Sequence, residues 1–172
     1  MKKTLLILSG IIALGFSTMQ AQRFALVDIE YILQQVPNYE AATEQLNQSS
    51  KQWEKEIAAL TTEAQTLYKN YQTEMVFLSD EMKVKREEAI IAKEKEAMDL
   101  KRTYFGADGE LFKKRESLLK PIQEEIYNAV KELSESKNLQ LILDRSSSTG
   151  IIFASPTIDI SDEVLQRMGY QQ

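Results

Sequence analysis

The sequence contains no cysteine and no histidine, and it has only three prolines and one tryptophan among 172 residues. Without cysteine the chain can form no disulfide bond, no thiolate nucleophile and no sulfur metal site. Without histidine it has no imidazole base and no His-ligated zinc, iron or copper. It also lacks a glycine-rich phosphate loop, a Gly-x-Ser-x-Gly elbow and EF-hand spacing. We therefore expect no catalytic site, no metal, no cofactor and no enzymatic activity.

The first 21 residues have the layout of a secretory signal peptide. Lys2 and Lys3 form a basic start, an apolar run follows from Leu5 to Phe16, and a short polar stretch ends at Ala21. A membrane anchor is the alternative, but this run is shorter than the ~20 apolar residues that a membrane span needs. We expect cleavage after Ala21 and, in a bacterium, export to the periplasm.

The expected mature chain is acidic. The full sequence has 21 basic and 26 acidic residues, and cleavage would remove only Lys2 and Lys3 from this set, which leaves a net charge of −7. A nucleic-acid-binding protein needs a basic face to neutralise phosphates. The charge therefore argues against a nucleic-acid partner.

Residues 39–137 are rich in Glu, Lys, Gln, Ala and Leu and are predicted to form a long helical hairpin. Its first half carries two apolar series with a step of seven residues, which are Leu46, Trp53, Leu60 and Leu67, and Ile57, Ala64, Tyr71 and Leu78. Its second half carries a third series, Val84, Ile91, Met98, Phe105, Phe112, Leu119, Ile126 and Leu133. Such repeats predict a coiled-coil-like seam, with a turn near 77–80 where Ser79 and Asp80 are suitable helix caps.

Three residues are expected to disturb the returning helix. Gly106, Gly109 and Pro121 fall inside it and should weaken or bend it. A complete break at 106–109 is the alternative, although Phe105 and Phe112 stay in phase across that segment.

The flanking segments, 22–38 and 138–172, are predicted to form a small β body. Three short strands are expected at 24–29, 139–144 and 151–154, the last two as a hairpin, with short helices at about 30–36 and from Ser161 to a closing Gly169. Asn38 is expected to cap the arm. The fold class is therefore α+β, a small sheet body with a long helical arm.

About fifty residues cannot bury a stable core alone, so we expect the body to self-associate. The residues assigned to this oligomer body are Leu26, Val27, Leu141, Leu143, Ile151 and Phe153.

The arm carries more apolar residues than one seam needs. One residue before members of the third series lie Ile90, Ala97, Tyr104 and Leu111, which widens the apolar face. Surplus apolar surface framed by charge is typical of a protein that binds many partners. The candidate binding residues are Tyr68, Tyr71, Met75, Phe77, Leu78, Met82, Ile90, Ala97, Met98 and Tyr104. The alternative for each of them is that it fills the seam.

A basic cluster lies beside the predicted tip. Lys83, Lys85 and Arg86 could attract anionic lipid or lipopolysaccharide headgroups. The alternative is a solvated helix face that Glu87 and Glu88 balance.

Four segments resemble the Skp (OmpH-type) family of periplasmic chaperones. They are Ala25-Leu-Val-Asp28, Leu141-Ile-Leu-Asp144, Ile151-Ile-Phe153 and Asp159-Ile-Ser-Asp-Glu-Val-Leu165. With the helical middle, the resemblance covers the whole mature chain. The C-terminal strands and the helix start after them are its most specific part, because heptads are generic.

The resemblance implies a homotrimer with a central β body and three arms around a cavity. It implies that unfolded outer-membrane β-barrel proteins are held there without ATP and passed to the outer-membrane assembly machinery. Two departures stand out, since familiar members are basic where this chain is acidic, and Phe153 replaces a common Tyr. The family's proposed lipopolysaccharide site has no residue-by-residue match, so only a weak contact with lipopolysaccharide or a membrane surface is expected.

A non-chaperone role is the competing hypothesis. The hairpin could be a structural spacer, like the helical hairpin of a periplasmic efflux-pump adaptor. Such an adaptor needs lipoyl-like and barrel domains around the hairpin, and about fifty flanking residues are too few for them.

Overall fold

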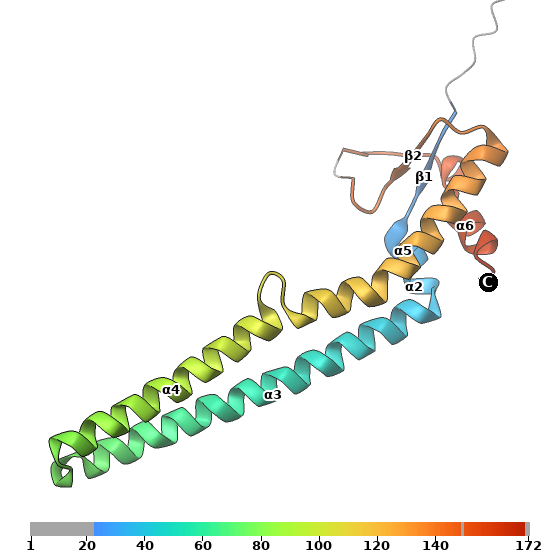
Figure 1. The fold of residues 1–172 in the computed structure, drawn as a ribbon. Coiled ribbons are helices and arrows are strands. Elements are labelled where there is room, and N and C mark those ends of the chain that lie inside the picture. The colour runs from blue at the N-terminus through green and yellow to red at the C-terminus, as the bar shows by residue number, and fades with distance from the viewer. Residues whose placement is uncertain (1–22, 149, 171–172) are drawn as a thin grey trace, which may run out of the picture.

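The computed structural model describes residues 23–148 and 150–170, so the predicted signal segment lies outside the described residues. A long two-stranded helical arm projects from a small body that contains both the first and the last elements (Figure 1). The elements are β1 (Phe24–Val27), α2 (Ile29–Gln35), α3 (Pro37–Glu74), the 3-10 turn η1 (Met75–Phe77), α4 (Asp80–Phe105), α5 (Glu110–Lys137), β2 (Leu141–Asp144), the 3-10 turn η2 (Pro156–Ile158) and α6 (Ser161–Arg167). None of the described helices is long and apolar enough to cross a membrane.

The outgoing helix α3 has the predicted seam. It runs for 38 residues, about 57 Å at ~1.5 Å per residue, and lies against both α4 and α5. Seven members of the two predicted heptad series lie on α3 and the eighth, Leu78, follows η1; all eight are buried or half-buried, with Leu46 and Ala64 the most enclosed. The hairpin and its outgoing seam are therefore confirmed.

The returning helix α4 uses a different face from the one that its longest heptad series predicted. Ile90 and Ala97, at 6% and 8% exposure, form the seam, whereas Val84, Ile91 and Met98 are 52%, 62% and 68% exposed. The two series are one residue apart and therefore about 100° apart around the helix, and along residues 84–98 the partner helix α3 covers only the series of Ile90 and Ala97.

The turn at the far end of the arm is close to the predicted position. Helix α3 ends at Glu74, η1 follows, and α4 begins at Asp80. The Ser79 side chain caps α4 by accepting a hydrogen bond from the Met82 N–H at 3.4 Å.

The returning helix of the arm is interrupted at 106–109, where α4 ends and α5 begins. This is the complete break that the sequence gave as the alternative. The Gly106 N–H closes α4 by donating to the Arg102 carbonyl at 2.8 Å, and the Gly109 N–H donates to the Gly106 carbonyl at 2.9 Å. A Cβ on Gly109 would lie 2.8 Å from the Tyr104 carbonyl oxygen, so only glycine fits this close approach. Pro121 lies within α5 and does not end it, and α5 curves along its length in Figure 1.

The sheet of the body has two strands where the sequence predicted three. Strands β1 and β2 pair in parallel, from Phe24 opposite Leu141 to Val27 opposite Asp144. After β2 the Arg145 N–H donates to the Val27 carbonyl at 2.8 Å, which carries the chain across the end of β1. Residues 151–154 form no strand, so the predicted hairpin is wrong. Ile152 and Phe153 are 101% and 85% exposed.

The core of the body is formed by β1, α2, α6, the start of α3 and the second half of α5. Its buried residues are Ala25, Val27, Ile32, Val36, Ala42, Ile122, Ile126, Ala129, Leu133, Ile160, Val164 and Leu165. The core therefore reaches into residues 122–133, within the segment that the sequence assigned to the arm.

Two helix boundaries of the body bear on the sequence predictions. Val36 precedes α3 and Pro37 is its first residue, so Asn38 is not the expected cap. Proline suits this first position because its ring already holds a helical φ and no N–H is needed there. Gly169, with φ of +86°, follows α6 and closes it as predicted.

Candidate functional site

The structure divides the predicted binding residues of the arm into three groups. Tyr68, Met75, Phe77, Met82 and Met98 are exposed. Tyr71 and Leu78 are half-buried. Of the remaining three, Ile90 and Ala97 are buried in the seam, and Tyr104 is half-buried with its ring stacked on Trp53 of α3.

An aromatic contact locks the middle of the arm. The rings of Trp53 and Tyr104 are stacked with centroids 4.8 Å apart, and Phe105 meets Trp53 edge-on at 6.3 Å. The Tyr104 hydroxyl donates to Glu56 at 2.7 Å. This bond lowers the pKa of Glu56 and raises the pKa of Tyr104, because it favours the carboxylate and the neutral phenol. Tyr104 therefore holds the hairpin together.

A second tyrosine contact ties the hairpin nearer its tip. The Tyr71 hydroxyl donates to Glu87 at 2.5 Å, which raises the pKa of Tyr71. Lys93 lies between Glu63 on α3 and Glu96 on its own helix, at 3.3 and 2.8 Å. The Tyr71–Glu87 and Lys93–Glu63 contacts join α3 to α4, whereas the Lys93–Glu96 contact lies within α4.

The turn at the end of the arm carries a group of exposed apolar side chains, which we call the tip cluster. It consists of Met75, Val76, Phe77 and Met82. The 3-10 turn places three consecutive apolar residues outside the seam, and Phe77 is 87% exposed. Leu78 alone turns back toward the hairpin and is half-buried. The tip cluster is thus a solvent-accessible apolar surface, in which Val76 and Phe77 are almost fully exposed.

A second apolar surface, which we call the outer stripe, follows α4. It consists of Val84, Ile91 and Met98, one residue per two helical turns. Neighbouring positions on the exposed face are charged or small, among them Glu88 and Lys95. The described chain therefore leaves three apolar residues at a regular heptad step on a solvent-facing side of α4.

The basic cluster beside the tip is paired with carboxylates. Lys83 contacts Asp80 at 3.1 Å, and Lys85 contacts Glu81 at 2.7 Å. Arg86 on α4 contacts Glu74 on α3 at 3.1 Å. Each cation therefore has a local counter-charge, which weakens its attraction for anionic headgroups.

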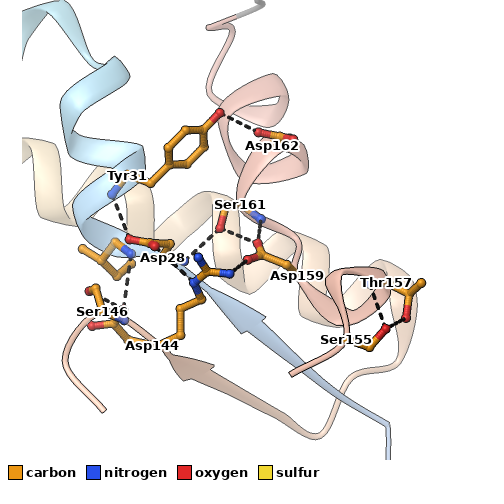
Figure 2. Close-up of polar contacts among 11 residues, drawn as sticks. Asp28, Tyr31, Asp144, Ser146, Ser155, Thr157, Asp159, Ser161 and Asp162 are labelled. Carbon is orange, nitrogen blue, oxygen red and sulfur yellow. Dashed lines mark hydrogen bonds and ion pairs between the residues drawn. The ribbon is translucent and has the colours of Figure 1, made fainter. Parts of the chain in front are cut away.

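A polar network joins the ends of both strands to α6 (Figure 2). Arg145 contacts Asp28 at 3.1 Å and Asp159 at 2.9 Å. Asp159 accepts hydrogen bonds from the N–H and hydroxyl of Ser161, and that hydroxyl in turn accepts from the Asp28 N–H at 2.8 Å. The network thus connects segments that lie more than 100 residues apart in the sequence.

Asp144 and Tyr31 extend this network. Partial burial would raise the pKa of Asp144, but hydrogen bonds from Ser147, Ser146 and the backbone lower it to about 2. The Tyr31 hydroxyl donates to Asp162 on α6 at 2.9 Å. Within residues 23–148 and 150–170, no group of carboxylates is arranged to hold a metal ion. We interpret this network as structural because its contacts join the end of β1, the end of β2 and the start of α6.

The residues assigned to the oligomer body are split by the structure. Leu26 and Val27 are buried within the chain's own body, both at 3% exposure. Leu141, Leu143 and Phe153 are exposed, and Ile151 is half-buried. The exposed members lie on β2, whose outer edge pairs with no other strand of the described residues, and on the segment after it.

Sequence reasoning missed Val76, Val84, Ile91 and Ile152 as exposed apolar residues. For Val84 and Ile91 a signal existed, because two parallel heptad series on one helix cannot both face the same partner. The position of Val76 next to the predicted turn could have indicated its exposure, because the residues of η1, between α3 and α4, lie outside the seam.

Comparisons with known proteins agree with this architecture. A family model described as outer membrane protein (OmpH-like) matches residues 23–168. Chaperone protein Skp of Yersinia enterocolitica is 26% identical over 171 residues, covering 98% of this chain and 99% of the relative. The crystal structure of an OmpH-like protein from Caulobacter crescentus superposes with a TM-score of 0.68 at 14% identity, over 90% of this chain and 88% of that one, which shows the fold. Because the family model covers almost the whole described chain, the protein belongs to the OmpH-like (Skp-type) family of outer membrane chaperones.

Proposed function

We propose that the chain is an ATP-independent periplasmic holdase that binds unfolded outer-membrane β-barrel proteins through the apolar surface of its arm. The observation that supports this most directly is the outer stripe, which remains exposed although the hairpin seam beside it is complete. A spacer protein needs only the seam, so an additional heptad series on the solvent face favours a binding role over a structural one.

The chemistry of the arm suits non-native chains. An unfolded β-barrel protein presents short apolar segments in many arrangements, and methionine and aromatic side chains adapt to varied shapes. The tip cluster and the outer stripe offer separate small contacts, so each is weak and release is easy. Several contacts on one client can nevertheless sum to useful avidity.

We propose that the body assembles copies of the chain, as a homotrimer according to the family resemblance. Ile152 and Phe153 project into solvent, and the outer edge of β2 is free in the described chain. Exposed strand edges and apolar side chains of this kind are usually covered by another chain. Three bodies joined in this way would place three arms around a shared space.

The proposal includes export to the periplasm and transfer of clients to the outer-membrane assembly machinery. A weak contact with lipopolysaccharide or a membrane surface receives less support, since Lys83, Lys85 and Arg86 each have a carboxylate partner. The alternative is the structural spacer, which would neither bind clients nor depend on the outer stripe.

A light-scattering assay distinguishes a holdase from a structural spacer. A β-barrel protein unfolded in urea is diluted into buffer with the mature chain, residues 22–172. We expect the chain to suppress aggregation near one oligomer per client. The triple variant Val84→Gln, Ile91→Gln, Met98→Gln should lose most of this effect, since glutamine keeps the helix and removes the apolar surface.

The matched control has glutamine at Lys85, Ala92 and Asp99, one residue further along α4, where all three side chains are exposed. It has the same spacing, and its two charge changes cancel. The control should suppress aggregation like the wild type. Equal activity of all three proteins would contradict a role for the outer stripe, and no activity in any would favour the spacer.

A further inference from the structure

Sulfur in this chain occurs only as methionine, since the sequence has six methionines and no cysteine. The described residues include four of them. Met75, Met82 and Met98 are exposed on the arm. Met168 is half-buried and packs against the body core.

The three exposed methionines coincide with the proposed binding surfaces. Met75 and Met82 belong to the tip cluster, and Met98 is the most exposed member of the outer stripe. None of them lies in the seam of the hairpin, which Ile90, Ala97 and the Trp53–Tyr104 stack occupy. A chemical change at these sulfurs would therefore alter the surface and leave the fold intact.

Exposed thioethers react with peroxides. The sulfur lone pair attacks one peroxide oxygen, the O–O bond breaks, and a new S–O bond forms while the other oxygen leaves as water. Sulfur is oxidised by two electrons and the peroxide is reduced. The product, methionine sulfoxide, is polar and chiral, and methionine sulfoxide reductases restore the thioether.

We propose that Met75, Met82 and Met98 are reversible oxidation sites through which peroxide switches off the binding surface of the arm. This inference rests on the proposed function, because it concerns the regulation of that same surface. Sulfoxides at these positions make the tip cluster polar and remove one of the three apolar groups of the outer stripe. Met168 is shielded by its packing against the core and reacts slowest.

The test treats the mature chain with dilute hydrogen peroxide and follows oxygen addition to each methionine by peptide mass spectrometry. We expect Met98, Met82 and Met75 to be oxidised roughly ten-fold faster than Met168, since oxidation follows exposure. Two readouts are taken on the oxidised protein, namely fluorescence of an apolar dye that binds the arm and suppression of client aggregation. Both should fall by about half or more, while the far-UV circular dichroism is unchanged.

The variant Met75→Leu, Met82→Leu, Met98→Leu keeps an apolar side chain of similar volume at each position, so peroxide should change neither its dye binding nor its aggregation suppression from the values of the same variant before treatment. The variant Met168→Leu is the matched control and should remain as sensitive as the wild type. Sulfoxide reductases should restore the oxidised wild type.

Several results would overturn the inference. They are equal oxidation of Met168 and the arm methionines, unchanged dye binding after the three sulfoxides have formed, or equal loss in the triple leucine variant. Failure of the unoxidised protein to suppress aggregation would instead contradict the proposed function, and the dye readout would still decide whether oxidation changes the arm surface.

Discussion

Replacing Arg145 with alanine should loosen the body selectively. The guanidinium contacts Asp28 at the end of β1 and Asp159 before α6, at 3.1 and 2.9 Å. Both carboxylates are mostly covered, whereas the arginine is about half exposed, so each ion pair should stabilise the body by about 1 kcal/mol. Loss of both pairs therefore costs about 2 kcal/mol, and it leaves two neighbouring carboxylates without their shared cation.

Hydrogen exchange measured by mass spectrometry is the appropriate assay, because it reports the body and the arm separately. A loss of about 2 kcal/mol corresponds to roughly 30-fold faster exchange of the protected amides in β1 and α6. Peptides around Trp53 should exchange at the wild-type rate. Arg145→Lys is the control, because one ammonium cannot reproduce the forked contact and should restore only part of the protection. Unchanged exchange in β1 and α6, or equal acceleration in the arm, would refute the structural role of this network.

Three further predictions concern the arm, the break and acid stability. Tyr104→Ala should destabilise the arm by about 2 kcal/mol and shift the emission of Trp53 to longer wavelength in urea titrations, since it removes the stacked ring and a hydrogen bond. Gly109→Ala should cost about 1–3 kcal/mol in thermal unfolding, because its Cβ meets backbone atoms, whereas Gly150→Ala, with nothing within 4 Å, should be nearly neutral. Because the pKa of Asp144 is lowered from its usual 3.8 to about 2, the ionised carboxylate stabilises the fold above pH 3.8, and this stabilisation is lost as the pH falls towards about 2. The body should therefore weaken in that pH window, and Asp144→Asn should flatten the pH dependence of its stability. A variant with the same pH profile as the wild type would contradict this role of Asp144.

The sequence predicted those features of the fold that depend on local signals. The hairpin, its turn and its outgoing seam follow from heptad spacing and from Ser79 as a cap, both of which act over a few residues. Gly106 and Gly109 indicated a complete break in the returning helix only as an alternative to a bend. Propensity alone could not decide it, since Phe105 and Phe112 continue the heptad across the loop.

Features that depend on distant contacts could not be predicted in the same way. On α4 two adjacent apolar series could each form the seam with α3. The packing of the two helices shows that Ile90 is buried in the seam and that Ile91 is exposed. The expected strand at 151–154 has no partner within the described chain. Instead Leu26 of β1 forms an isolated bridge with Asp159, a contact between distant segments that no local signal indicates.

The sequence predicted that apolar side chains would be exposed on the arm, but it identified only some of the residues that are exposed. Surplus apolar residues on the arm were expected, and the tip residues Met75, Phe77 and Met82 are indeed exposed. Tyr104 was assigned to the surface because aromatic side chains suit both a binding face and a helix seam. Its stacking partner Trp53 lies on the other helix of the hairpin, which sequence order alone does not bring into contact.

Site-specific photo-crosslinking reports directly whether the outer stripe contacts an unfolded protein. A photoreactive phenylalanine analogue is placed at Ile91 in the outer stripe, or at the adjacent exposed Ala92 as the control, and the mature chain is irradiated with a urea-diluted β-barrel protein. We predict strong crosslinks from position 91 and weak ones from position 92. Equal crosslinking from both positions, or none from position 91, would contradict binding of unfolded proteins by the outer stripe.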